Sequence, residues 1–267
     1  MNHWSKRKDW QLVGSPLIPN DEDLANFRAF PETFISEPLN IMVLGATLGL
    51  IMNNWKNCDT ISTVDNVRIR LELADKLEAE KVLFMFDDWL TMTCPIQSNY
   101  IIGDGSIHCV EYDKFEAFAK NIHKHTTQSG YLALRVFLPQ MLNEETPKMA
   151  LKILKDFEEF KISSFHDFKR QLMCSLIDAE YKVVLEDVYN TFILLSQSTI
   201  NKVFEHFDWN PDLLKTMDSF RNSKCFYTFP PKAAIFSKLE KYFRPISFYT
   251  SSYQNSDNYP VIVFKKV

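Results

Sequence analysis

The sequence predicts an α/β fold in which a mostly parallel sheet carries helices on both faces. The first observation is that short apolar or β-branched segments within residues 39–138 are spaced by helical stretches. This spacing is typical of parallel strands joined by helical crossovers. The second is that four of the six glycines lie at the ends of two such segments, and none follows residue 130. Because glycine permits close backbone approach, we expect a ligand site in the first half of the chain.

The composition is that of a globular protein, with 46% apolar and 24% charged residues and a net charge of −4. This charge argues against a broad basic surface for nucleic acid. No apolar run reaches the ~18 residues of a membrane-spanning helix, and the amino-terminal residues lack the apolar segment of a signal peptide. Five cysteines form no C-x-x-C pair, which favours reduced thiols over disulfides or a zinc site. We therefore expect a cytoplasmic protein with no nucleic-acid, membrane or metal partner.

Four parts are predicted along the chain. They are an amino-terminal arm or cap (1–37), a ligand-binding core (38–143), a helical insertion (144–225) and carboxyl-terminal strands that complete the sheet (226–267). In the arm, an extended segment leads to a short helix capped by Asn20, with acidic residues in its first turn. The arm either packs on the core or folds over a ligand, and the second alternative makes Trp10 a candidate substrate contact.

The first strand and turn occupy Leu39 to Ile51. Residues 41–44 are uniformly apolar, as a buried parallel strand requires. Gly45 and Gly49 then break the strand, and a helix is expected over about 48–56. A second strand, 60–65, ends at Asp65, twenty residues after Gly45. This spacing predicts a βαβ unit that holds a ligand with a ribose.

The remaining core elements continue the alternation. A helix, two strands, a helix and a strand are predicted at 66–80, 81–86, 98–102, 112–125 and 130–138. Beyond them, apolar spacing in 144–219 predicts four to five helices with core faces. The chain returns to β structure from residue 226, with strands at 243–250 and 259–265 on either side of a polar turn.

The glycine pattern limits the type of nucleotide ligand. A dinucleotide fingerprint that begins at Gly45 would need glycines where Thr47 and Leu50 stand. A phosphate-binding G-K-[ST] loop is also absent from the sequence. A ligand with ribose and adenine but no pyrophosphate fits better, and S-adenosylmethionine meets that description.

The order of these features resembles that of class I S-adenosylmethionine-dependent methyltransferases. Residues 45–49 look like the first motif of that family, and Asp65 like its ribose-binding acid. Asp88 and Trp89 look like the pair that meets the adenine, and residues 99–106 like the fourth motif. The resemblance covers 39–138 well, 226–267 loosely and 144–219 not at all.

The resemblance implies a Rossmann-like, seven-stranded, mostly parallel sheet with an antiparallel carboxyl-terminal strand and a helical insertion between strands five and six. Two positions depart from the family pattern: Val43 stands where the family has an acid, and Thr47 replaces a glycine. The implied cofactor-binding residues are Gly45, Ala46, Thr47, Gly49, Asp65, Asn66, Asp88, Trp89, Asp104, Gly105 and Ser106.

The catalytic candidates are Asp104 and His108. Asp104 is expected to bind the cofactor ammonium, orient substrate or act as a base, or else to be an ordinary turn residue. His108 is a candidate proton acceptor at neutral pH. Arg135, a charge inside a predicted strand, is expected either to bind a substrate carboxylate or to form a buried ion pair.

These expectations predict an enzyme that transfers a methyl group to oxygen or nitrogen of a small molecule, with residues 144–225 as a substrate cover and a monomeric or homodimeric state. The alternative is a catalytically inactive protein that binds S-adenosylmethionine as a scaffold. A nucleotide-dependent dehydrogenase is a third interpretation, which the incomplete glycine pattern disfavours.

Overall fold

The computed structural model describes residues 10–66, 82–93, 95–139 and 146–267. The predicted helix at 66–80 lies outside the described residues apart from Asn66. The chain forms two compact units: a sheet unit (19–137 with 231–267) and a helical unit (138–230 with the first 18 residues). Residues 19–37, expected as part of the arm, group with the sheet because Phe27 and Phe30 share a buried cluster with Ile41 and Val43.

In the sheet unit the described residues form one seven-stranded sheet of order β3-β2-β1-β4-β5-β9-β8. Its strands are β1 (Leu39–Leu44), β2 (Cys58–Asp65), β3 (Leu83–Phe86), β4 (Ser98–Asp104), β5 (Thr126–Arg135), β8 (Phe243–Tyr249) and β9 (Val261–Lys266). The first five strands pair in parallel. Only β9 is reversed, since it pairs antiparallel with both β5 and β8. The predicted mostly parallel sheet with an antiparallel carboxyl-terminal strand is confirmed.

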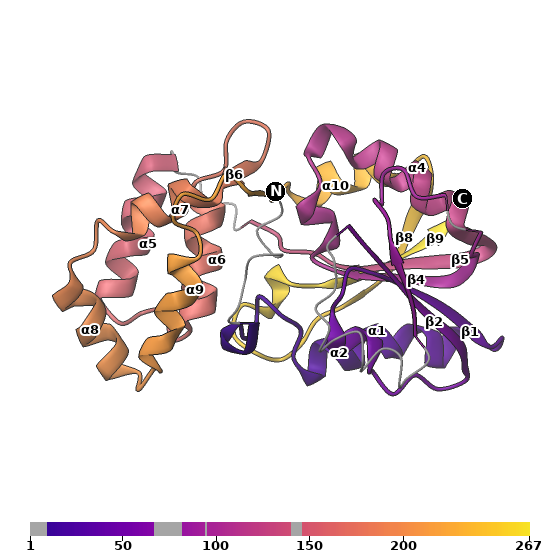
Figure 1. Cartoon of the computed structure of the whole chain (residues 1–267), viewed down its shortest axis with the longest axis horizontal. Helices are drawn as coiled ribbons and strands as arrows, with labels where there is room; N and C mark the ends of the chain where they lie inside the picture. The colour runs from indigo at the N-terminus through magenta and orange to yellow at the C-terminus, as the bar shows by residue number, and fades with distance from the viewer. Residues whose placement is uncertain (1–9, 67–81, 94, 140–145) are drawn as a thin grey trace. The chain divides into compact units, whose positions relative to one another are not determined.

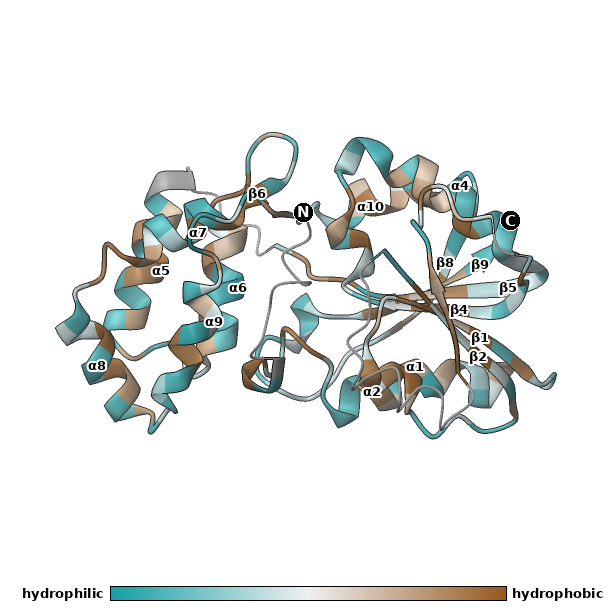
Figure 2. Cartoon of the chain, in the orientation of Figure 1, coloured by the Kyte–Doolittle hydropathy of each residue, from teal (hydrophilic) through white to brown (hydrophobic). Residues whose placement is uncertain are grey.

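Helices cover both faces of the sheet (Figure 1). One face carries α1 (Asp21–Phe34) and α2 (Leu48–Ile51), and the other carries α4 (Phe115–His125) and α10 (Lys232–Leu239). The central strands β1 and β4 are buried along almost their whole length, and β1 is also apolar apart from Asn40 (Figure 2). The predicted cap of α1 is present as a capping box, in which Asn20 and Asp23 each accept the other's backbone N–H.

Several element boundaries differ from the sequence prediction, among them those of α2, β5 and the segment before β8. Helix α2 is a single turn rather than 48–56, because Asn54 and Asn57 adopt positive φ angles of 37° and 50° that end helical geometry. Strand β5 begins at Thr126, not Gly130, because Thr126 already pairs with Ser98 of β4, and the strand continues through a register irregularity at Gly130. In 226–242, which was expected to be β structure, helix α10 follows a three-residue strand.

The described part of the helical unit contains five α-helices, as predicted. They are α5 (Thr146–Glu158), α6 (Phe165–Ser175), α7 (Leu185–Phe192), α8 (Gln197–His206) and α9 (Leu214–Asp218). Nearly every residue of α6 is buried, and the rings of Phe157 and Phe168 lie 4.1 Å apart. These phenylalanines therefore build a core. A two-stranded sheet of β6 (Lys182–Val184) and β7 (Phe226–Thr228) was not predicted.

We expect Gly103→Ala to destabilise the protein by about 1–3 kcal/mol. A Cβ at this position would overlap Ser106 Oγ and lie 3.1 Å from Leu134 Cδ2, both in a buried region. Urea unfolding measures the change. Gly49→Ala is the matched control, because its Cβ would lie 3.3 Å from the flexible end of Leu24 and alanine favours the helix. Equal losses in the two variants would contradict the packing argument.

Candidate functional site

The candidate site lies at the carboxyl ends of β1, β2 and β4. Strand β1 has β2 on one side and β4 on the other, so the strand order reverses beside β1. Ligands of open α/β sheets bind outside the carboxyl ends of the strands at this reversal point. Gly45, Asp65 and Asp104 stand there, at or just after the last residue of their strands.

The turn after β1 is held by the neighbouring strand β2. Gly45 has a φ of +106°, which side chains rarely permit, and its N–H donates to Val64 O at 2.9 Å. Its carbonyl accepts the Thr63 hydroxyl at 2.7 Å. The Ala46 N–H donates to Asp65 Oδ2 at 3.1 Å. The turn and the predicted ribose-binding carboxylate are therefore in direct contact.

Two other residues of the first motif have different surroundings. Thr47 is the N-cap of α2, but its hydroxyl makes no capping bond. A Cβ on Gly49 would lie 3.3 Å from Leu24 Cδ2, so this glycine accommodates the packing of α1 on α2. Helix packing thus accounts for a glycine at position 49 without the predicted cofactor contact. The Thr47 hydroxyl, in contrast, remains suited to bind a ligand.

Trp89 completes the group of predicted cofactor residues that the structure brings together. Its indole N–H donates to Val64 O at 2.8 Å, and its ring lies 3.7 Å from the Cβ position of Gly45. Asp88 is exposed, and its Oδ1 accepts the Leu90 N–H at 2.8 Å. Asp88 thus closes the turn that follows β3 and still presents a carboxylate to solvent.

Asp104 and Arg135 form a buried ion-pair network rather than a ligand contact. Arg135 Nε donates to Asp104 Oδ1 at 2.6 Å and its Nη1 donates to Asp23 Oδ2 at 2.8 Å, with the guanidinium fully buried. Of the two roles expected for Arg135, the ion pair is the one observed. Burial raises the pKa of the Asp104 carboxyl, and the positive charge of Arg135 opposes this shift.

His108 does not have the surroundings expected of a general base. It lies in the 3₁₀ turn η3 (Ser106–Cys109), is 1% exposed and stacks on Phe137. Its Nε2 accepts the Phe137 N–H at 2.7 Å, so the lone pair needed for proton transfer is already engaged. The predicted role as proton acceptor is therefore not supported by this geometry.

The two small residues before His108 shape the end of β4. Gly105 adopts a left-handed conformation with φ +62°. The buried Ser106 hydroxyl donates to Leu44 O at 2.7 Å, which ties the turn after β4 to the end of β1. Ser106 therefore fixes the turn after β4. The buried Gly105 closes this turn, since its N–H donates to Arg135 O and its carbonyl accepts the His108 N–H, each at 3.0 Å. The cofactor contacts expected of Gly105 and Ser106 stay predictions.

Some residues near the site were not predicted, and one prediction lies outside the described structure. Phe86, at the end of β3 and paired in register with Asp65, is 60% exposed. Asn121 and His125 of α4 contact the segment that carries Trp89. Their sequence signal is two polar residues on the apolar side of a helix.

The side chain of Trp10, the expected substrate contact, lies outside the described residues, and Asn66 is exposed at the end of β2.

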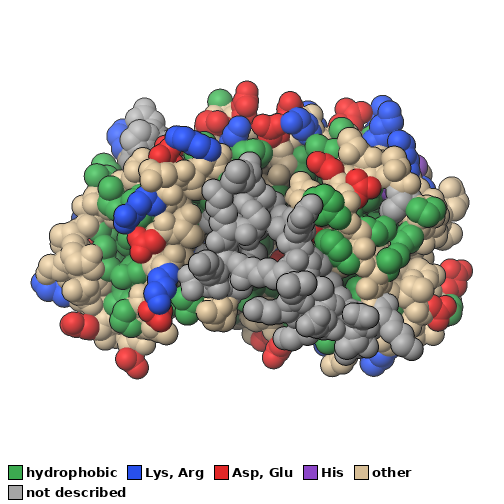
Figure 3. Space-filling view, viewed as in Figure 1, with side chains coloured by type: hydrophobic (Ala, Val, Ile, Leu, Met, Phe, Trp, Pro, Cys, Tyr) green, Lys and Arg blue, Asp and Glu red, His purple; other side chains and the backbone are tan. Residues whose placement is uncertain are grey.

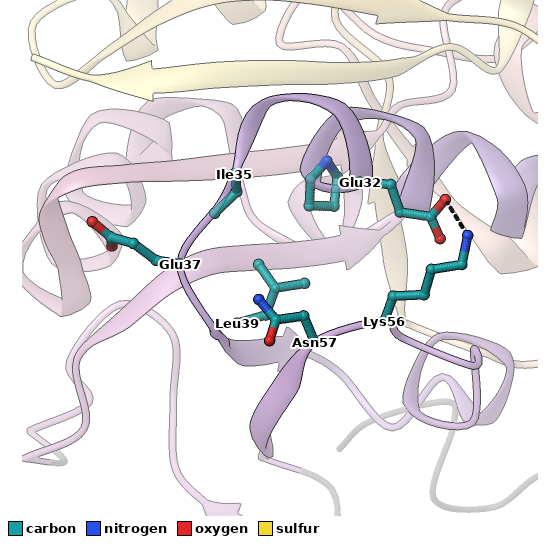
Figure 4. A pocket seen from close by; sticks show the side chains of 7 residues that line it. Glu32, Ile35, Glu37, Leu39, Lys56 and Asn57 are labelled. Carbon is teal, nitrogen blue, oxygen red and sulfur yellow. Dashed lines mark hydrogen bonds and ion pairs between the residues drawn. The ribbon is translucent and has the colours of Figure 1, made fainter.

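A hollow of about 180 Å³ lies elsewhere on the sheet unit (Figure 4). It is lined by Ile35, Leu39, Asn57 and the ion pair of Glu32 with Lys56, among others. Leu39 and Asn57 mark the amino ends of β1 and β2, so this hollow is at the sheet edge opposite to Gly45 and Asp65. We assign it no role in the candidate site.

The surface in view carries interspersed positive and negative side chains (Figure 3). Across the described ranges, no helix combines the length and apolarity needed to cross a membrane. The same residues include no cluster of three or more histidine, cysteine or acidic side chains suited to hold a metal ion.

No protein-family model and no curated protein matches the sequence. Solved structures match the fold. A methyltransferase of Burkholderia thailandensis, described with bound 1,6-didemethyltoxoflavin and S-adenosylhomocysteine, is 11% identical with a TM-score of 0.51, covering 91% of this chain and 77% of that chain. A S-adenosylmethionine-dependent methyltransferase of Methanosarcina mazei is 12% identical with a TM-score of 0.51, covering 88% and 96%. The chain has the class I methyltransferase fold.

A third neighbour has a different description. A Rhodobacter sphaeroides protein, provisionally described as a Zn-dependent alcohol dehydrogenase, is 14% identical with a TM-score of 0.60, covering 100% of this chain and 99% of that chain. At such identities the likeness concerns the fold alone. The dinucleotide sheet of dehydrogenases has the order 3-2-1-4-5-6, whereas here the reversed β9 lies between β5 and β8. The methyltransferase fold therefore describes this topology better.

We expect Arg135→Met to destabilise the protein by about 3–5 kcal/mol, because it leaves two carboxylates buried without their cation. Asp104→Asn should cost markedly less, since it leaves the neutral pair of Asp23 with Arg135. Chemical unfolding at neutral pH measures both variants. A loss for Asp104→Asn as large as that for Arg135→Met would show that charge balance in the network is not what stabilises it.

Proposed function

We propose that this chain is a S-adenosylmethionine-dependent methyltransferase that acts on oxygen or nitrogen of a small molecule. The observation that carries the proposal is the convergence of Gly45, Asp65 and Trp89. They come from three segments of the chain and meet at the reversal point of the sheet. Within this fold, that point is where a nucleotide-like ligand binds.

The residues present fit an adenosyl ligand with an amino-acid tail. Asp65 offers carboxylate oxygens for two ribose hydroxyls. Trp89 offers an aromatic surface, and Asp88 an exposed acceptor for the exocyclic amine of adenine. At the other end of the turn, the Thr47 hydroxyl is suited to the polar groups of the methionine part. The cofactor would supply a methyl group already activated on a sulfonium.

The proposed chemistry depends on positioning more than on proton transfer. The Asp104 carboxylate is paired with the buried Arg135, and the Nε2 lone pair of His108 accepts the Phe137 N–H, so both groups already have structural partners. A neutral amine can attack the methyl group first and lose its proton to water afterwards. In-line approach to the sulfonium then becomes the main contribution of the protein.

Several parts of the proposal rest on the sequence alone. The role of residues 144–225 as a substrate cover follows from their place in the chain between β5 and β8. A cytoplasmic location, the absence of nucleic-acid and membrane partners, and a monomeric or homodimeric state also stay predictions. The alternative of an inactive scaffold is not favoured by the neighbours described as methyltransferases. Detection of methylated product with a panel of amines and phenols would exclude it.

We expect Asp65→Asn to weaken S-adenosylhomocysteine binding roughly ten- to a hundredfold, the loss typical of a hydrogen bond to a charged group. Asparagine keeps the shape and can still accept the Ala46 N–H, so the turn should persist. Isothermal titration calorimetry measures the affinity. Asp59→Asn is the matched control, because Asp59 is exposed near the opposite end of β2. Wild-type protein that binds no S-adenosylhomocysteine would refute the proposed function.

Thr47→Asp should abolish binding of the cofactor, by bulk and by repulsion of its carboxylate. Thr47→Ser keeps the hydroxyl and should bind within about threefold of wild type, a difference under about 1 kcal/mol. Titration with S-adenosylhomocysteine compares the two variants. Unchanged affinity in Thr47→Asp would mean that the turn faces something other than the methionine part of the ligand.

A further inference from the structure

Helix α4 holds the segment that carries the predicted adenine contacts. We call residues 87–93 the Trp89 loop. Asn121 Nδ2 donates to Trp89 O at 3.0 Å and to Met92 O at 3.3 Å. One helical turn later, His125 Nε2 lies 3.1 Å from Met92 O, and its Nδ1 lies 3.3 Å from Ile96 O. Because both ring nitrogens face carbonyl oxygens, one neutral tautomer donates to the Trp89 loop at Met92 and the other donates to Ile96, just beyond the loop.

These two polar residues stand on an otherwise apolar, buried side of α4. Asn121 is 5% exposed and His125 7%, while Phe118, Ala119 and Ile122 are fully buried. Residues four apart lie on the same face of a helix, so Asn121 and His125 form one polar strip. A buried amide or imidazole destabilises a fold unless it is hydrogen-bonded. The hydrogen bonds described for this strip go to the Trp89 loop and to Ile96.

The other end of Trp89 is attached to the nucleotide turn. Its carbonyl is bound by α4, and its indole N–H by Val64 O of β2, the residue before Asp65. Asp87 N–H also donates to Asp65 O at 3.2 Å. The loop is therefore fixed at both sides, and its aromatic ring lies beside the turn at Gly45.

We propose that Asn121 and His125 are positioning residues of the cofactor site, which act through Trp89 and Asp88 and do not touch the ligand themselves. The inference rests on the proposed function, because it assigns these residues to the adenosyl end of that site. Loss of their hydrogen bonds releases the backbone of the Trp89 loop while the ligand-binding side chains remain unchanged. The affinity for an adenosyl ligand then falls because the free loop must be ordered when the ligand binds.

The experiment compares Asn121→Asp with Gln97→Ala. Aspartate keeps the shape of asparagine but faces the two loop carbonyls without a donor. Gln97 is exposed and donates to Lys124 O at 2.7 Å, so its removal takes away a nearby bond to α4 that does not lead to Trp89. For Asn121→Asp we expect about tenfold weaker S-adenosylhomocysteine binding by calorimetry. Gln97→Ala should stay within twofold of wild type.

A spectroscopic readout makes the test independent of the ligand. The indole N–H signal of Trp89 in a ¹⁵N-labelled sample can be assigned by its loss in Trp89→Phe. In Asn121→Asp without ligand this signal should shift and exchange faster with solvent, and in Gln97→Ala it should not. If wild type binds no S-adenosylhomocysteine, the proposed function fails, yet the Trp89 signal still decides whether α4 positions the loop. An unmoved signal together with wild-type affinity in Asn121→Asp would overturn the inference.

A second pair of variants covers the case in which Asn121→Asp does not fold. His125→Leu removes the contacts to Met92 O and Ile96 O, whereas His125→Gln keeps an amide donor. We expect the leucine variant to lose affinity and to shift the Trp89 signal, and the glutamine variant to restore both at least in part. Equal behaviour of the two variants would show that His125 contributes packing alone.

Discussion

The buried guanidinium of Arg135 is the interaction on which the arrangement of the sheet unit most depends. Taking a charge out of water is costly unless partners of opposite charge and good geometry accompany it. Asp104, its register partner on β4, and Asp23, in the first turn of α1, provide those partners. Asp23 also accepts the hydroxyls of Ser251 and Tyr253 from the connection between β8 and β9. One charge therefore requires α1, β4, β5 and this connection to be in place together.

A second set of hydrogen bonds stabilises the candidate site at the carboxyl ends of the strands. The Thr63 hydroxyl binds the Gly45 carbonyl, the Ser106 hydroxyl binds the Leu44 carbonyl, and Asp65 binds the Ala46 amide. These contacts join the ends of β1, β2 and β4 before any ligand is present. A turn held this way loses little conformational freedom on binding, so more of the interaction energy remains for affinity. Fold and ligand site thus share the same hydrogen bonds.

The sequence predicted those parts of the structure that local pattern determines. The bounds of β1 follow from an apolar run between Pro38 and Gly45, and the end of β2 at Asp65 follows from an alternating, β-branched run. The meeting of Gly45, Asp65 and Trp89 was predicted from a family resemblance. What local pattern could not give is the partner of a side chain far away in the chain. His108 looked like a base until its bond to the Phe137 amide, 29 residues away, was known. No role was predicted for Asn121, because the loop that it binds lies 32 residues earlier in the chain.

The double use of Asp23 has a consequence for how the protein opens. Its carboxylate closes the capping box with Asn20 and also binds Arg135, which is 112 residues further along the chain. Helix ends usually fray independently of the rest of a fold. Here, fraying of the start of α1 would leave Arg135 without the carboxylate of Asp23. Opening of the helix start is therefore coupled to the loss of an ion pair at the end of β5. The amide protons of Asn20 and Asp23, which the capping box binds, are therefore expected to exchange with the slowly exchanging cooperative unit of the central sheet, although they lie at a helix end near the beginning of the chain.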